Sequence, residues 1–61
     1  MNKNKMTLIV LDAKSVTVNE YTIPKDIAKS PECVEEFIED QGHDLDVCQY
    51  MVAKRVEYRS H

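Results

Sequence analysis

The segment between Ser30 and Gly42 constrains the fold more than any other part of the sequence. Ser30 is a favourable N-cap residue, and Pro31 suits the first position of a helix. Gly42 is the only glycine of the chain and is a typical residue to end a helix. The apolar residues between these ends follow helical spacing: Val34, Phe37 and Ile38. These signals predict a helix over residues 31–41.

Two segments before this helix have the composition of strands. Residues 5–11 are rich in β-branched side chains, and residues 16–23 continue in the same way until Pro24. The polar residues 12–15 lack the Asn-Gly pair of a tight hairpin and fit a four-residue loop around a type I turn. The sequence therefore predicts a hairpin, followed by a turn or short helical piece at residues 25–29.

The second strand does not alternate cleanly. Strict alternation would place Val16 and Val18 on one face and Tyr21 and Ile23 on the other. A β-bulge at residues 19–20 would bring all four apolar side chains to the same face. The sequence leaves both arrangements open.

The last segment, residues 45–59, fits both a strand and a helix. Valine, tyrosine and cysteine are better strand formers than helix formers, which favours the strand. We predict an α+β fold in the order ββαβ, with one helix on one face of a three-stranded sheet. The alternative is ββαα, with residues 44–58 helical. We expect one small domain over residues 1–61, frayed at residues 1–4 and 60–61.

The predicted sheet is apolar on both faces. Leu8 and Val10 point one way from the first strand, whereas Ile9 and Leu11 point the other way. A helix of eleven residues covers only one face, so the second face needs another cover. Either residues 24–30 wrap over part of it, or it is open to a partner, of which a second copy in a homodimer is the simplest. The alternative is that Met51 and Ala53 are merely half exposed, which is normal for isolated apolar residues.

Charge is distributed unevenly along the chain. The net charge is −3, yet residues 32–46 hold seven Asp and Glu residues and no Lys or Arg. Several of these acidic residues lie four apart on the predicted helix, where like charges repel each other. Such a surface favours a partner with a basic groove. The candidate partner-binding residues are Glu32, Glu35, Glu36, Glu39, Asp40, Asp44 and Asp46, with Met51 on the sheet.

No pattern of metal ligands or catalytic residues is recognisable. The Cys and His residues (Cys33, His43, Cys48 and His61) match no standard zinc spacing. A Cys33–His43 pair would lack both an oxyanion site and a third orienting group, so we expect Cys33 to be a small buried hydrophobe. We therefore expect no metal, no cofactor and no enzymatic activity.

The sequence predicts a non-enzymatic module that inhibits or adapts a larger, basic-surfaced protein. The alternative is a small nucleic-acid-binding module that stacks bases on sheet tyrosines and uses Lys and Arg at the strand ends. The net charge of −3 argues against this alternative, because nucleic-acid-binding proteins are usually basic. In length and acidity alone, without a shared motif, the chain resembles short phage or mobile-element proteins that block a host factor.

The sequence also predicts a cytoplasmic location without membrane contact. The longest early apolar run, Leu8 to Leu11, is too short for a signal peptide or a membrane helix. In the cytoplasm both cysteines are expected to remain reduced thiols.

Overall fold

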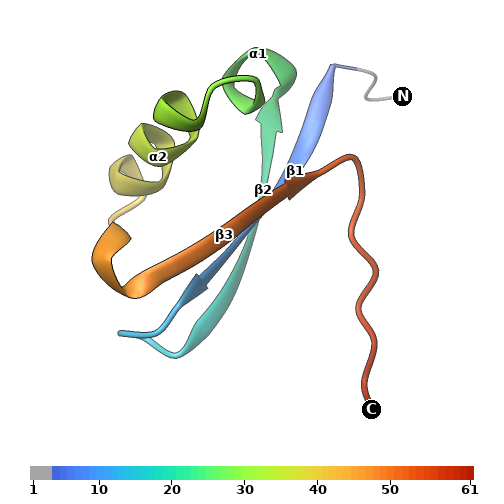
Figure 1. The fold of residues 1–61 in the computed structure, drawn as a ribbon. Coiled ribbons are helices and arrows are strands. Elements are labelled where there is room, and N and C mark those ends of the chain that lie inside the picture. The colour runs from blue at the N-terminus through green and yellow to red at the C-terminus, as the bar shows by residue number, and fades with distance from the viewer. Residues whose placement is uncertain (1–3) are drawn as a thin grey trace.

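Three antiparallel strands form a sheet in the order β2–β1–β3 in the computed structural model, which describes residues 4–61 (Figure 1). The central strand β1 (Lys5–Asp12) pairs with β2 (Thr17–Pro24) and with β3 (Cys48–Ala53). This arrangement confirms the predicted α+β fold and its ββαβ order.

One main helix covers one face of the sheet. α2 (Pro31–Asp40) lies on the same side as the one-turn helix α1 (Lys25–Ala28), which is the short helical piece expected after the second strand (Figure 1). α2 begins and ends within one residue of its prediction. Ser30 takes the N-cap position, although its side chain does not bond to the helix.

The core lies between α2 and the sheet. Its fully buried side chains come from β1, β2 and α2: Leu8, Val10, Ile23, Val34 and Ile38. Phe37 is only partly buried and packs at the margin of this core. Alternation along β1 explains the selection, because Leu8 and Val10 point toward α2 while Leu11 points away and is half exposed.

The β1–β2 hairpin is regular. β1 and β2 are joined by residues 13–16, so the predicted loop length is confirmed. Of the two arrangements that the sequence left open for the second strand, the structure has strict alternation without a bulge at residues 19–20, because the pairing runs without interruption from Lys5–Pro24 to Asp12–Thr17. Val18 therefore points away from the core and is exposed. Val16 lies in the loop, exposed and in the left-handed region at φ 56°.

The last strand is shorter than predicted. β3 confirms the strand over Cys48–Ala53, and the helical alternative for residues 44–58 is wrong apart from one 3-10 turn, η1 (Leu45–Val47). Asp44 caps this turn by accepting a hydrogen bond from the Asp46 amide at 3.0 Å. Beyond Ala53 the chain leaves its partner β1, and the last residues form no helix or strand.

The second face of the sheet is only partly covered, and Leu11, Val18 and Met51 are exposed on it. Residues 24–30 do not wrap over it, because α1 packs against the core on the α2 side. Instead, the C-terminal segment, residues 54–61, runs on the side opposite α2 (Figure 1). The Tyr58 hydroxyl donates a hydrogen bond of 2.6 Å to Glu20 in β2. Ile9 is buried in the middle of this face, whereas Met51 is half exposed.

The prediction that residues 1–4 and 60–61 are frayed can be followed only for Asn4, Ser60 and His61. Residues 1–3 lie outside the described part, and the Asn4 carbonyl accepts a 2.7 Å hydrogen bond from the Lys25 amide. Ser60 and His61 are exposed and outside regular structure. Within residues 4–61, no helix has the length and apolar character needed to span a bilayer.

Candidate functional site

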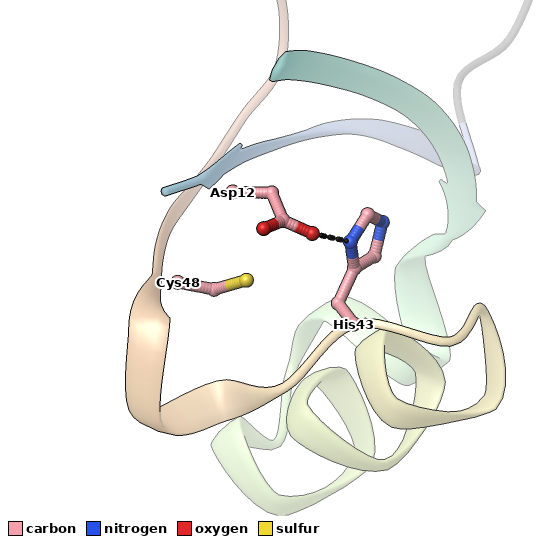
Figure 2. Close-up of side chains that lie close together, drawn as sticks. All are labelled: Asp12, His43 and Cys48. Atoms are coloured by element: carbon pink, nitrogen blue, oxygen red, sulfur yellow. Dashed lines mark hydrogen bonds and ion pairs between the residues drawn. The ribbon is translucent and has the colours of Figure 1, made fainter. Parts of the chain in front are cut away.

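Three side chains with metal-binding or acid–base chemistry meet at one end of the sheet, on the side that faces α2. Asp12 ends β1, Cys48 begins β3, and the two residues pair directly across the strands. His43 reaches the same place from the loop after α2, and Figure 2 shows the three side chains converging. One donor atom from each residue lies within 4.8 Å of the donors of the other two.

The C-terminus of α2 positions His43. The Gly42 amide donates to the Glu39 carbonyl at 2.9 Å, and the His43 amide donates to the Ile38 carbonyl at 3.3 Å. These two bonds form a Schellman motif, in which the residue after the helix adopts a left-handed conformation. Gly42 does so at φ 93°, which is why glycine is suited to this position. The motif turns the chain back toward the sheet, so His43 points at Asp12.

A chain of hydrogen bonds orients the imidazole and the carboxylate. Asp12 Oδ2 and His43 Nδ1 are 2.7 Å apart, and His43 Nε2 and Tyr21 Oη are also 2.7 Å apart (Figure 2 shows the first pair). The second carboxylate oxygen of Asp12, Oδ1, accepts from the amides of Lys14 at 2.9 Å and Ser15 at 3.1 Å. The side chains of Asp12 and His43 are each only 10% exposed.

This network has a definite proton arrangement when His43 is neutral. Nδ1–H donates to the Asp12 carboxylate, and Nε2 accepts from the Tyr21 hydroxyl. Tyr21 is itself held by an edge-on contact with Phe37, whose ring centroid lies 5.5 Å away. The imidazole is therefore oriented on both sides, as ligating and catalytic histidines commonly are.

Local electrostatics act in opposite directions on the carboxyl and the thiol. The hydrogen bond from His43 lowers the pKa of Asp12, and the Ser15 and Lys14 amides contribute to this shift. Burial raises the pKa of the Cys48 thiol, and the negative charges of Asp12 and Asp44 raise it further. The site thus favours a carboxylate beside a protonated thiol.

The lowered pKa of Asp12 predicts a loss of stability in acid. Asp12 contributes its full stabilisation above the ordinary aspartate pKa of about 3.9, and this contribution is lost as pH falls through the lowered pKa of the folded state. Asp12→Asn removes the charge but keeps an oxygen for the two amides. In chelator-containing buffer, we expect the difference in urea midpoint between wild type and D12N to be largest near neutral pH. It should shrink below about pH 4.

The matched control is Asp26→Asn, which alters an exposed carboxylate in α1. It should leave the midpoint nearly unchanged throughout the pH range. A D12N difference that stays constant from neutral pH to about pH 3 would show that the Asp12 charge does not stabilise the fold.

The acidic residues predicted to bind a partner do not all lie on one surface. Glu32, Glu36, Glu39 and Asp40 are exposed on the outer side of α2, which we call the acidic face of α2. The two lying closer to the sheet have structural contacts: Glu35 accepts from the Tyr50 hydroxyl at 3.1 Å, and Asp44 caps η1. Asp46 is exposed on η1.

Met51 is separated from the acidic face of α2. It lies in β3 between Tyr50 and Val52, both of which pack against the core, so its side chain points to the opposite face of the sheet. A partner that contacts the acidic face of α2 therefore reaches Met51 only by passing around an edge of the sheet.

Sequence spacing alone missed the cluster at Asp12. The distances along the chain between its members reveal nothing, because the β1–β3 pairing and the turn after α2 bring them together. The expectation that Cys33 is buried is wrong: it is exposed, since Val34 and Ile38 occupy the buried stripe of α2. Cys33 and His61 are not part of the three-residue cluster.

Comparisons of the chain with protein-family models, curated protein sequences and solved structures return no match.

Proposed function

We propose that the protein is a non-enzymatic binding module whose acidic face of α2 engages a larger protein with a basic surface. The observation that supports this proposal is the absence of compensating charge. Among residues 4–61, none of the seven acidic residues from Glu32 to Asp46 forms an ion pair with Lys or Arg. The negative charge of the acidic face of α2 is therefore not neutralised by neighbouring cations, and its electrostatic field extends into the solvent.

Helix energetics point in the same direction. Glu32 and Glu36, and likewise Glu36 and Asp40, lie four residues apart on the exposed side of α2. Each such like-charge pair costs about 0.2–0.5 kcal/mol of helix stability. Glu39 and Asp40 also lie in the last turn, where the helix dipole opposes negative charge. A surface kept at this cost is consistent with selection for electrostatic steering of a partner.

The positions of the tyrosines weaken the nucleic-acid alternative. Tyr21 and Tyr50 point toward α2, where their hydroxyls bond to His43 and Glu35. Neither ring is presented on the open face of the sheet as a platform for bases. Tyr58 is exposed but lies on the C-terminal segment.

The proposal places the binding event in the cytoplasm, where both free thiols would stay reduced. The partner would be inhibited or recruited by a small protein of the phage or mobile-element type. Met51 and its neighbours on the opposite face offer a separate surface for a second copy of the chain, and the experiment tests the two surfaces independently.

The decisive variant combines Glu36→Gln, Glu39→Gln and Asp40→Asn. It removes three charges with little change of volume and relieves repulsion in α2, so the fold should be kept or slightly stabilised. Wild type and variant would serve as paired baits for a basic protein from the native host. We expect the purified captured protein to associate at least about tenfold more slowly with the variant at low salt, and to lose most of its salt dependence.

Two controls make the result specific. Asp26→Asn with Glu57→Gln removes acidic charges outside residues 32–46 and should bind like wild type. Met51→Lys changes only the opposite face and should do the same. An unchanged association rate and salt slope for the triple variant would refute the proposed role of α2. A loss confined to Met51→Lys would assign binding to the sheet.

A further inference from the structure

We infer that Asp12, His43 and Cys48 form a binding site for one divalent transition-metal ion, with Zn²⁺ as the ion that suits their chemistry. The inference is independent of the proposed role of the acidic face of α2. It starts from the convergence of a carboxylate, an imidazole and a thiol whose donor atoms lie within 4.8 Å of one another (Figure 2).

The distances are close to those of a tetrahedral site. Zinc bonds of about 2.0–2.3 Å place neighbouring ligand atoms about 3.3–3.6 Å apart. The Asp12–His43 pair, at 2.7 Å, must open slightly to admit the ion, and Cys48, whose Sγ lies within 4.8 Å of both, must approach by no more than about 1.5 Å. Side-chain rotations of this size need no change in the pairing of β1 with β3.

The backbone already holds two of the ligands in fixed relation. Asp12 and Cys48 are direct partners across β1 and β3, and their side chains share the face toward α2. Residues directly opposite in a sheet have Cβ atoms about 4.5–5.5 Å apart, which suits two ligands of one ion. His43 is brought to them by the Schellman motif at the end of α2.

The surrounding hydrogen bonds are those that a metal site requires. The Lys14 and Ser15 amides hold Asp12 Oδ1, which leaves Oδ2 directed at the cluster. Tyr21 holds His43 Nε2, which leaves Nδ1 for the ion. Outer partners of this kind fix the orientation of a ligating histidine and carboxylate.

Charge and proton balance also favour a dication. The Cys48 thiolate and the Asp12 carboxylate together carry two negative charges, which Zn²⁺ neutralises. On binding, the Cys48 thiol releases one proton to solvent. The Nδ1 proton of neutral His43 is transferred to Nε2, where Tyr21 Oη accepts the hydrogen bond. Three protein ligands leave the fourth tetrahedral position for water or an external ligand.

Co²⁺ titration of the untagged, reduced full chain tests the site. Co²⁺ bound through a thiolate gives a near-ultraviolet charge-transfer band and intense visible bands in a tetrahedral site. We expect both at one Co²⁺ per chain, their loss on addition of Zn²⁺, and the release of about one proton per ion at neutral pH. Cys48→Ser should abolish the charge-transfer band, whereas Cys33→Ser, which removes the exposed thiol, should retain it.

Two further measurements cover the case in which Cys48→Ser fails to fold. In wild type, NMR of the imidazole nitrogens should show Nδ1 ligation of His43 and no change at His61. Tyr21→Phe should weaken Co²⁺ binding about 10–100-fold while the ligands remain in place.

The inference is overturned if wild type gives no charge-transfer band, or if the band depends on Cys33 instead of Cys48. It is also overturned if one ion binds two chains, or if Zn²⁺ leaves the His43 resonances unchanged.

Discussion

Replacement of Ile38 by alanine is expected to remove about 2–5 kcal/mol from the free energy of unfolding. Ile38 is fully buried between α2 and the sheet, and it is one of the five buried side chains that form the core cluster within residues 4–61. A chain of this length is expected to be stable by only about 3–9 kcal/mol. The variant should therefore lose most of its stability, which urea unfolding followed by far-ultraviolet circular dichroism will measure.

The control for Ile38→Ala is Val18→Ala. Val18 is exposed on the face of β2 that points away from α2, and its truncation should change stability by no more than about 0.5 kcal/mol. Equal losses in the two variants would contradict the assignment of the core to the α2 side of the sheet.

Substitution of Gly42 by alanine is expected to cost about 1–2 kcal/mol. Gly42 has φ 93°, a conformation that residues with a Cβ atom rarely adopt. A Cβ atom placed there would meet nothing within 4 Å, so the cost comes from the backbone conformation and not from a clash. Urea unfolding would show the loss as a lower midpoint with an unchanged slope.

Gly42→Asn distinguishes this explanation from a general effect of adding a side chain. Asparagine tolerates the left-handed region better than alanine, so the Asn variant should be more stable than the Ala variant. If Ala and Asn lower the midpoint equally, or if Ala has no effect, the helix end does not depend on the left-handed residue.

Local signals predicted the helices and strands well. Pro31 and Gly42 act through their own backbone conformations, so the bounds of α2 were readable from neighbouring residues. The same applies to the hairpin loop, whose length follows from the polar break at Asp12–Ser15. The alternation of β1 correctly separated Leu8 and Val10 from Ile9 and Leu11.

Features that depend on contacts between distant parts of the chain could not be predicted from neighbouring residues. The sequence could not decide whether a bulge brings all apolar residues of β2 to one core; in the structure Val18 is exposed and Ile23 is buried. The ends of β3 depend on how far β1 extends as a partner, and the cover of the second face depends on the path of the C-terminal segment. These are properties of the assembled sheet.

The cluster of Asp12, His43 and Cys48 was missed for the same reason. A search based on Cys and His spacing omits a carboxylate from a hairpin 31 residues before the histidine. Two local signals were present: an aspartate at the start of a loop, where it accepts backbone hydrogen bonds, and a histidine directly after a helix-ending glycine. Neither indicates that the two residues meet.

The position of β1 in the middle of the sheet has a consequence for folding during synthesis. Of the three strands, β1 leaves the ribosome first, and β2 can pair with it as soon as β2 has emerged. Its other edge stays unpaired until the chain has emerged as far as Ala53, because β3 comes last of the three strands. An unpaired edge is a template for wrong strand pairing. The nascent chain is therefore most exposed to aggregation while α2 is emerging from the ribosome, before β3 has paired with β1.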